Sequence, residues 1–264
     1  MAFIEKRSGE LVYMCSTVIP ARHAFTTRLG GVSRGGFASL NLGSNRGDEP
    51  EAVRENYRRV CALMGADIDG CAVTRQVHGK AVRIVTPADR HVCMSAVPYE
   101  ADGIATGARG LPIMCFTADC VPALLCDGEL AAAAAVHCGW RSSALDILGE
   151  AVEKLRALGA RPENLRAAFG PAIGRCCFET DGDVPAALER YLGGDTAGLF
   201  DRRADGKFMV DLRAANARRL LQLGLRPENI DVSDECTMCS HDKYWSHRYT
   251  HGERGSQAAV IVLG

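Results

Sequence analysis

Two histidines and one cysteine stand where the sequence could place them at a reactive centre. His78 lies between two short apolar segments, and His137 ends a long apolar run and is followed by Cys-Gly-Trp. Between them comes Cys120, which follows Asp119 inside otherwise apolar sequence. Zinc prefers imidazole and thiolate ligands, and three protein ligands leave its fourth position for water. The residue types are therefore compatible with a catalytic zinc site, but on their own they are a weak signal, and ordinary loop and core residues are the commoner explanation of such a pattern.

The spacing of these residues limits the kind of metal site they could form. The gaps from His78 to Cys120 and from Cys120 to His137 are too long for a zinc finger or ribbon, so separate strand ends would have to bring the ligands together. Burying Asp119 costs free energy unless it is paired, so this carboxylate needs a partner.

Two other patterns carry weaker signals. Cys236 and Cys239 form a lone C-x-x-C pair, and the adjacent Cys176 and Cys177 are poorly spaced to complete a structural zinc site. We therefore expect core or surface thiols there. The turn from Thr27 to Ser33 is rich in glycine and includes Arg28. Such a turn can bind phosphate through backbone N–H groups and a guanidinium, although an ordinary hairpin is the alternative.

Composition excludes several classes of protein. The 264 residues are 47% hydrophobic and 24% charged, which is typical of a globular chain. The 31 basic and 32 acidic residues give a net charge of −1, so we expect no nucleic-acid binding. The sequence contains no apolar run long enough to span a membrane and no recognisable signal peptide, which predicts a cytoplasmic protein with reduced thiols and no membrane partner. Most of the 12 cysteines should then be core filler.

The apolar pattern predicts an α/β protein, which we expect to form a single domain over residues 1–264 with mixed sheets and flanking helices. Helices are expected from Asp48 to Gly65, from Ser142 or Ser143 to Gly159, and from Asp211 to Gly224. Short apolar runs predict strands at 71–74, 81–85, 113–117, 121–126, 130–137, 165–169 and 258–263. The segment 158–165 is echoed at 223–230, which indicates a repeated connector from helix to strand, and a cysteine pair follows each copy.

Taken in order, the motifs resemble those of the laccase-domain family, whose members are called polyphenol oxidase or purine nucleoside phosphorylase. The resemblance extends from about residue 25 to residue 261. The motifs that carry it are Thr27-Arg28-x-Gly30-Gly31-Val32-Ser33, Leu40-Asn41-Leu42-Gly43, Gln76-Val77-His78-Gly79, Ala101-Asp102-Gly103, Thr117-Ala118-Asp119-Cys120-Val121-Pro122, Val136-His137-Cys138-Gly139-Trp140-Arg141, Phe169-Gly170-Pro171-Ala172-Ile173-Gly174, Cys177-Phe178-Glu179 and Tyr244-Trp245-Ser246-His247-Arg248.

The resemblance implies one α/β domain with a cysteine hydrolase-like fold and a zinc ion bound by His78, Cys120 and His137. It also implies phosphorolysis of adenosine, inosine, guanosine and methylthioadenosine, together with hydrolytic deamination of adenosine. Purine nucleosides and phosphate would then be the partners of a monomer or small homo-oligomer. The chain departs from the family pattern near its C-terminus, where Tyr249 and Ser256 replace arginines that the family often has.

On this reading the zinc activates water for attack at C6 of adenosine. We predict that Asp119 or Glu179 transfers the proton. Arg28 and Ser33 are the first candidates for phosphate binding, and Asn41, Arg141 and Arg248 are further candidate substrate contacts.

Two other enzyme classes remain open. Cys120 could be a nucleophile with His137 as its base and Asp119 or another acid orienting the histidine, giving a cysteine hydrolase that acts on cell-wall muropeptides as some family members do. The family name also suggests copper-dependent phenol oxidation. A multicopper oxidase needs roughly ten histidines, many of them as His-x-His pairs. This chain has 7 histidines and no such pair, although copper could still bind at the His-His-Cys site. A non-enzymatic binding partner of a cell-division or envelope factor is a third class.

Overall fold

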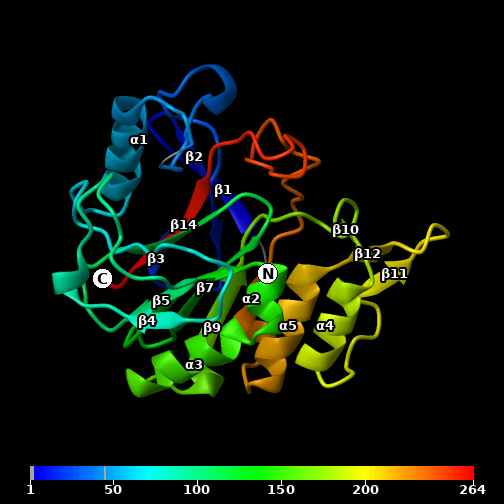
Figure 1. Ribbon diagram of the computed structural model, residues 1–264. Helices are drawn as coiled ribbons and strands as arrows, with labels where there is room; N and C mark the ends of the chain where they lie inside the picture. Colours follow the sequence, from blue (N-terminus) through cyan, green and yellow to red (C-terminus); the bar gives the residue numbers. More distant parts are fainter. Residues whose placement is uncertain (1–2, 45) are drawn as a thin grey trace.

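The computed structural model describes residues 3–44 and 46–264. Its first sheet has five antiparallel strands in the order β1-β2-β3-β14-β6. The sheet joins the two ends of the chain, because the C-terminal strand lies between β3 and β6 (Figure 1). Its strands are β1 (Phe3–Ser8), β2 (Leu11–Ser16), β3 (Arg22–Thr26), β6 (Ile113–Thr117) and β14 (Gln257–Val262).

The second sheet is mixed and has six strands in the order β13-β9-β7-β8-β5-β4. The pairs β4/β5 and β9/β13 are parallel, and the other neighbours are antiparallel. Its strands are β4 (Val82–Ile84), β5 (Gly103–Thr106), β7 (Val121–Asp127), β8 (Ala133–Cys138), β9 (Leu165–Phe169) and β13 (Ile230–Val232). A small third sheet contains β10 (Glu179–Thr180), β11 (Phe200–Arg202) and β12 (Phe208–Val210).

In the described residues, five α-helices cover the outer faces of the two large sheets (Figure 1). Helix α1 packs on the five-stranded sheet, and α3, α4 and α5 pack on the six-stranded sheet. The helices are α1 (Pro50–Leu63), α2 (Trp140–Ala144), α3 (Ile147–Ala157), α4 (Asp183–Tyr191) and α5 (Leu212–Gln222). The described chain is therefore layered in the order helix, sheet, sheet, helices, and none of its helices is both long and apolar enough to cross a membrane.

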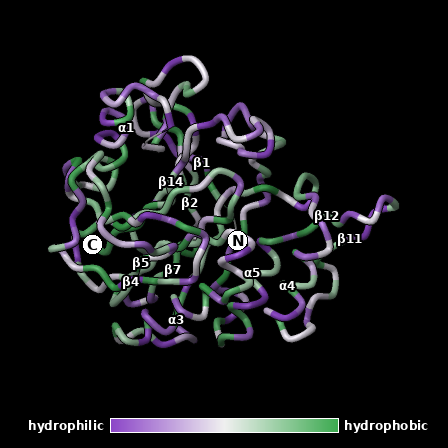
Figure 2. The backbone as a smooth tube through the Cα atoms, in the orientation of Figure 1, coloured by the Kyte–Doolittle hydropathy of each residue, from purple (hydrophilic) through white to green (hydrophobic). Residues whose placement is uncertain are grey.

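Alternation along the central strands explains this layering. On β6, Ile113 and Cys115 pack between the sheets while Met114 packs toward α1. On β7, Leu124 packs between the sheets while Leu125 packs toward the helices. Successive strand residues point to opposite faces, so a strand covered on both sides must be apolar at every position. Figure 2 shows the contrast with the projecting β11–β12 hairpin, which is largely hydrophilic.

Several expected elements are confirmed. Strands β6 and β9 have the predicted bounds, and the strand predicted at 130–137 corresponds to β8. Asp211 caps α5 by accepting a hydrogen bond from the backbone of Ala214 at 2.9 Å. Both copies of the repeated connector form a short 3-10 turn followed by a strand, and the two strands, β9 and β13, pair in parallel.

Other expectations are wrong. Asp48 does not cap α1: the cap residue is Glu49, and the Asp48 carboxylate accepts a hydrogen bond from Asn41 at 2.9 Å. The helix expected from Ser142 or Ser143 is two helices. Asp146 caps the second helix from a left-handed conformation with φ 66°.

The strand prediction is wrong for residues 71–74. This segment forms one isolated bridge, from Ala72 to Ile113 of β6, and no full strand. The predicted set also omitted β1, β2, β3, β5, β10, β11 and β12, and helix α4 was not predicted.

Candidate metal centre and substrate cavity

Three separate parts of the chain bring the predicted ligands together at one end of the second sheet. His78 lies in the loop before β4, Cys120 in the tight turn between β6 and β7, and His137 on β8. Because β7 and β8 are paired, Pro122 lies opposite His137, and the Cys120 turn reaches the same end of the sheet. One potential ligand atom from each of the three residues lies within 4.8 Å of the others. The prediction that strand ends assemble this group is confirmed.

A buried carboxylate that the site prediction omitted orients both histidines. Asp102 is fully buried and accepts hydrogen bonds from the backbone N–H groups of residues 77, 78 and 79 at 2.7 to 3.1 Å. These bonds support His78 in a left-handed conformation with φ 59°. The other bond to Asp102 comes from His137 Nδ1 at 2.9 Å, which leaves His137 Nε2 free to face the cluster. Carboxylates commonly orient metal-binding histidines in this way.

The charges of this group are coupled. Burial alone would raise the pKa of Asp102, but its hydrogen bonds from His137 and from the backbone hold that pKa below its ordinary value. Burial also opposes ionisation of Cys120, yet the neighbouring His137 and then His78 lower the pKa of the thiol to about 6. Burial opposes protonation of His137, but Cys120 and Asp102 raise the pKa of its imidazole to about 9. Cys120 is therefore a thiolate at neutral pH, the form that serves as a metal ligand or a nucleophile.

Gly139 leaves the space in which the three side chains converge. A Cβ atom at this position would lie 3.0 Å from His78 Cδ2, 3.3 Å from Cys120 Sγ and 3.7 Å from a carbon of the His137 ring. A residue larger than glycine would therefore fill the cradle between the ligands. The donor set and this open space fit a zinc ion with three protein ligands.

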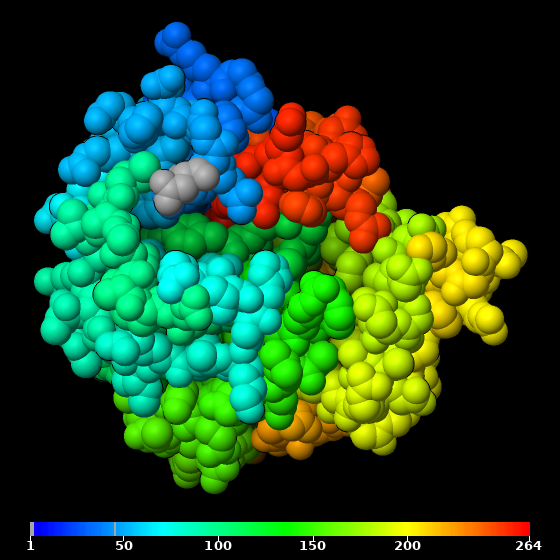
Figure 3. Space-filling model, in the orientation of Figure 1, coloured from blue at the N-terminus to red at the C-terminus, as the bar shows by residue number. Residues whose placement is uncertain are grey.

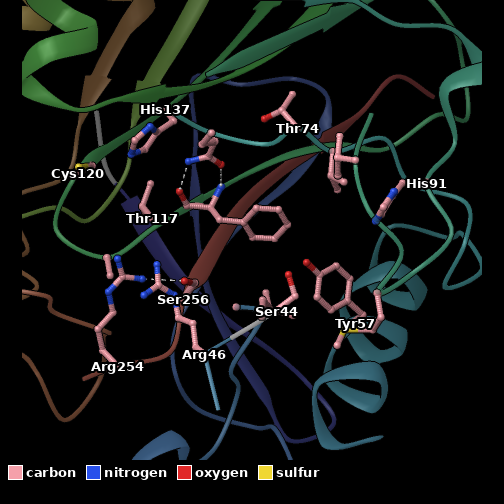
Figure 4. A pocket seen from close by; sticks show the side chains of 18 of the residues that line it. Ser44, Arg46, Tyr57, Thr74, His91, Thr117, Cys120, His137, Arg254 and Ser256 are labelled. Carbon is pink, nitrogen blue, oxygen red and sulfur yellow. Dashed lines mark hydrogen bonds between the residues drawn. The ribbon is translucent and has the colours of Figure 1, made fainter. Parts of the chain in front are cut away.

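The three residues line one end of a cavity of about 290 Å³. Figure 3 shows the hollow on the face of the molecule between the segment around α1, the loop before β4 and the C-terminal loop. In Figure 4, Cys120 and His137 lie at one side of the cavity, Arg46, Arg254 and Ser256 face them, and Tyr57 and His91 lie at the far side. A small organic substrate could therefore contact the metal ligands and the arginines at the same time.

Two arginines give one wall of the cavity a positive charge. Arg254 is half-buried and donates hydrogen bonds to Ser256 Oγ at 2.8 Å and to the Gly255 carbonyl at 3.0 Å. Burial and then the charge of Arg46 lower the pKa of Arg254 to about 10. Among the described residues, Arg254 Nε is buried without a hydrogen-bond partner. Two cations that disfavour one another, one of them with an unpaired N–H donor, are suited to bind an anion.

Two aromatic side chains and one side-chain amide form another part of the lining. The rings of Tyr57 and Phe116 lie 5.9 Å apart between centroids. The side-chain amide of Gln76 bonds to both the N–H and the carbonyl of Phe116 at 2.7 Å, which fixes this wall. Such a surface suits a flat heterocycle.

Comparison with known proteins identifies the family of the chain. The family described as "Multi-copper polyphenol oxidoreductase laccase" matches residues 22–264. The chain belongs to this family. It is 34% identical to a purine nucleoside phosphorylase of Corynebacterium glutamicum over 92% of this chain and 95% of that protein. It is 31% identical to adenosine deaminase RL5 from an unknown prokaryotic organism, over 85% of this chain and 87% of that protein.

A solved structure of similar fold is that of YlmD from Geobacillus stearothermophilus. Its TM-score is 0.91 at 31% sequence identity, with 99% of each chain covered. The α/β fold with mixed sheets, predicted from the sequence, is thus shared with this family. The relatives support a purine nucleoside-processing enzyme of the laccase-domain family.

The residues predicted to bind phosphate do not line the cavity of this family member. The Arg28 guanidinium donates to the carbonyls of Ala38 and His241 and lies 4.0 Å above the Trp245 ring. Ser33 is buried and accepts a hydrogen bond from Asn56 at 2.9 Å. The glycine-rich turn therefore uses its polar groups within the fold.

Asn41 has an indirect place in the site. It is fully buried, and its Oδ1 accepts hydrogen bonds from the backbone N–H groups of Gly43 at 2.7 Å and Ser256 at 2.9 Å. Both of those residues line the cavity, although Asn41 itself does not. Asn41 thus positions two wall segments that come from opposite ends of the chain.

Two predicted arginines also lie outside the cavity lining. Arg141 is exposed, with its guanidinium 4.3 Å above the Trp140 ring. Arg248 donates to the carbonyls of Cys177 and Glu179 at 3.5 and 3.0 Å.

The two predicted proton carriers already have partners. The carboxylate of Glu179 pairs with Arg203 at 3.1 Å. Asp119 is buried, and its two oxygens accept bonds from Thr237 Oγ1 and the Arg248 backbone N–H, both at 2.6 Å. The partners that Asp119 was predicted to need are therefore the Thr237 hydroxyl and the Arg248 backbone N–H.

Prediction from the sequence missed the cavity arginines and Asp102. Asp102 carried a usable signal, because an acidic residue inside the apolar segment before β5 needs buried partners. Arg46 and Arg254 carried none, since both lie in loops far apart in the sequence and become neighbours only through the fold.

Proposed function

We propose that the protein is a zinc-dependent purine nucleoside enzyme that catalyses phosphorolysis of adenosine, inosine, guanosine and methylthioadenosine, and hydrolytic deamination of adenosine. The observation that carries the proposal is that His78, Cys120 and His137 share one cavity with Arg46 and Arg254. A nucleoside and a phosphate could meet there beside a metal. The names of the relatives support the same class of substrate.

A zinc ion would be held by His78, Cys120 and His137, and when bound it would activate water or polarise the substrate at neutral pH. Asp102 would keep the His137 ring in the orientation that turns Nε2 toward the metal. Tyr57 and Phe116 would pack against the purine and exclude water from it.

For phosphate we propose Arg46 and Arg254, because Arg28 and Ser33 are occupied by other partners. In phosphorolysis a phosphate oxygen attacks C1′, the bond from C1′ to the purine nitrogen breaks, and the purine leaves with a proton. Guanidinium groups suit this step since they bind phosphate through two parallel hydrogen bonds and remain charged.

The proton carrier proposed from the sequence is Asp119 or Glu179. Asp119 directly precedes the ligand Cys120 and is bonded to the loop that carries Arg248. Asp119→Asn and Glu179→Gln identify the carrier, because loss of the carrier should both lower kcat and change its pH profile while leaving the bound metal in place.

The test is an assay of the zinc-loaded protein with adenosine, with and without phosphate, in which adenine and inosine are separated. We expect adenine only with phosphate and inosine in both cases. Arg254→Met should raise the KM for phosphate while deamination continues, and the surface variant Arg156→Met is the matched control. Neither product at any zinc occupancy would refute the proposal.

A cysteine hydrolase is the second candidate, favoured by the pairing of a Cys120 thiolate with His137 and of His137 with Asp102. The orienting acid would be Asp102, which bonds to His137 Nδ1 at 2.9 Å, whereas the sequence indicated Asp119 or another acid for this role. Cell-wall muropeptides are the substrate class to assay. Activity on them that survives chelators and is abolished by alkylation of Cys120 would favour this candidate over the zinc enzyme.

A further inference from the structure

Four cysteines meet at a second place that the proposed activity does not use. Cys176 and Cys177 follow β9, and Cys236 and Cys239 follow β13. The sulfur atoms of all four lie within 4.8 Å of one another. The expectation that the two pairs are poorly placed to share a ligand is therefore wrong.

The sheet explains why the two pairs meet. The strands β9 and β13 are parallel neighbours, so the segments that follow them leave the same edge of the sheet. A further bridge joins Ala172 to Cys236 just beyond these strands. The repeated connectors thus place a cysteine pair after each of two adjacent strands, which spacing along the chain alone does not reveal.

The distances between the sulfur atoms fit a shared metal better than a disulfide. The Sγ atom of Cys239 lies 3.6 Å from that of Cys176 and 3.4 Å from that of Cys177. A tetrahedral zinc ion with zinc–sulfur bonds of about 2.3 Å holds its sulfurs about 3.8 Å apart. A disulfide requires about 2.05 Å.

The backbone around Cys236 suits a metal-bound thiolate. The N–H of Gly174 donates to Cys236 Sγ at 3.2 Å, and the N–H groups of Met238 and Cys239 also face this sulfur. Backbone donors directed at a sulfur stabilise its negative charge, as charge-assisted hydrogen bonds do. A Cβ atom at Gly174 would lie 3.2 Å from Cys176 Sγ, so this turn brings the backbone close to the cluster.

We propose that Cys176, Cys177, Cys236 and Cys239 bind a second, structural zinc ion. Four cysteine ligands leave no open position for substrate, so the ion would hold two loops together. One of these loops carries Thr237, whose hydroxyl bonds to Asp119 at 2.6 Å beside the ligand Cys120. The second zinc would thereby support the turn that positions Cys120. This inference does not depend on the identity of the substrate.

The first test is the metal content of the protein after it is stripped, reduced and reloaded with zinc alone. The intact chain should hold about two zinc ions. Cys239→Ser should hold one, as should Cys176→Ser, and both cysteines are exposed, so these variants should fold. Cys120→Ala should lose the other zinc, and Cys126→Ala, outside both clusters, should keep both.

X-ray absorption at the zinc edge then identifies the ligands. In the double variant His78→Ala with Cys120→Ala, the remaining zinc should have four sulfur neighbours at about 2.3 Å. A single zinc that is lost in this double variant and retained in Cys239→Ser would overturn the inference. So would a disulfide among these four cysteines in protein purified under reducing conditions, detected as protected thiols by alkylation and mass measurement.

Discussion

The substitution Gly139→Ala tests whether the proposed metal centre needs the open space at this position, with little effect on the stability of the fold. Gly139 precedes α2 with φ −69° and ψ 161°, an extended conformation that alanine adopts without strain. The substitution therefore costs no backbone energy, and the restriction of the unfolded chain, which favours alanine by about 0.4 to 1 kcal/mol, offsets the cost of the close contacts that the methyl group makes. What it changes is the space between the ligands.

The magnitude follows from the three contacts of the added methyl group. At 3.0 Å from His78 Cδ2 and 3.3 Å from Cys120 Sγ, it is tighter than ordinary van der Waals contact, so both side chains must move by a few tenths of an ångström. The tight turn and the bonds to Asp102 resist that movement. Disturbing the groups that orient metal ligands typically lowers affinity about 10- to 100-fold, and we expect a loss in this range.

The assay combines zinc competition against a chromophoric chelator with thermal unfolding of the metal-free protein. We expect the zinc affinity to fall while the Tm of the metal-free protein is unchanged or slightly higher. Gly36→Ala is the matched control, because a Cβ atom there meets nothing within 4 Å. If Gly139→Ala bound zinc as tightly as the intact chain, the ligands would not converge at Gly139 and the proposed geometry would be wrong.

Three further substitutions test other parts of the structure. Asp102→Asn should lower zinc affinity about 10- to 100-fold and reduce stability, since an amide cannot accept all the hydrogen bonds that the carboxylate accepts; unchanged affinity in a chelator titration would contradict this role. Burial lowers the pKa of His23 from its ordinary value of 6.5. The neutral imidazole therefore contributes its full stabilisation above pH 6.5, and this stabilisation is lost as the pH falls through the lower, folded-state pKa. Urea unfolding of His23→Gln should thus depend less on pH below 6.5 than unfolding of the intact chain, and equal slopes would argue against a neutral buried His23. Asp146→Ala removes the cap of α3 and an ion pair with Arg219. It should lower the free energy of unfolding, measured in urea, by about 1 to 2 kcal/mol. A loss smaller than the error of the measurement would refute the capping role.

The sequence predicts well those features that depend on local pattern. Strands such as β6 and β9 are continuous apolar runs, and the cap at Asp211 is a local interaction. The N-terminal strand β1 is mostly exposed, so its residues lack the apolar pattern that identifies a buried strand. The break between α2 and α3 depends on the left-handed Asp146, which the helical spacing of leucines conceals.

The site shows the same division between local and long-range information. His78, Cys120 and His137 could be proposed together because each stands in a short motif that resembles the laccase-domain family, whereas their residue types and spacing alone were a weak signal. Arg46 and Arg254 could not, since arginines in loops are common and their closeness arises from the tertiary fold. The four-cysteine cluster was missed for the same reason: its two pairs meet only through the parallel pairing of β9 and β13.

One turn connects the proposed metal centre to the cavity wall that carries Arg46 and Arg254. Cys120 faces the cavity, while the preceding Asp119, held at φ 82°, bonds to Thr237 and to the backbone of Arg248. Arg254 belongs to the same C-terminal loop as Arg248. Thr237 lies between Cys236 and Cys239, two members of the four-cysteine cluster. A shift of this turn would therefore move a metal ligand relative to the arginine wall. In physical terms, Asp119 is suited to set the distance between the two halves of the cavity, whether or not it also carries a proton.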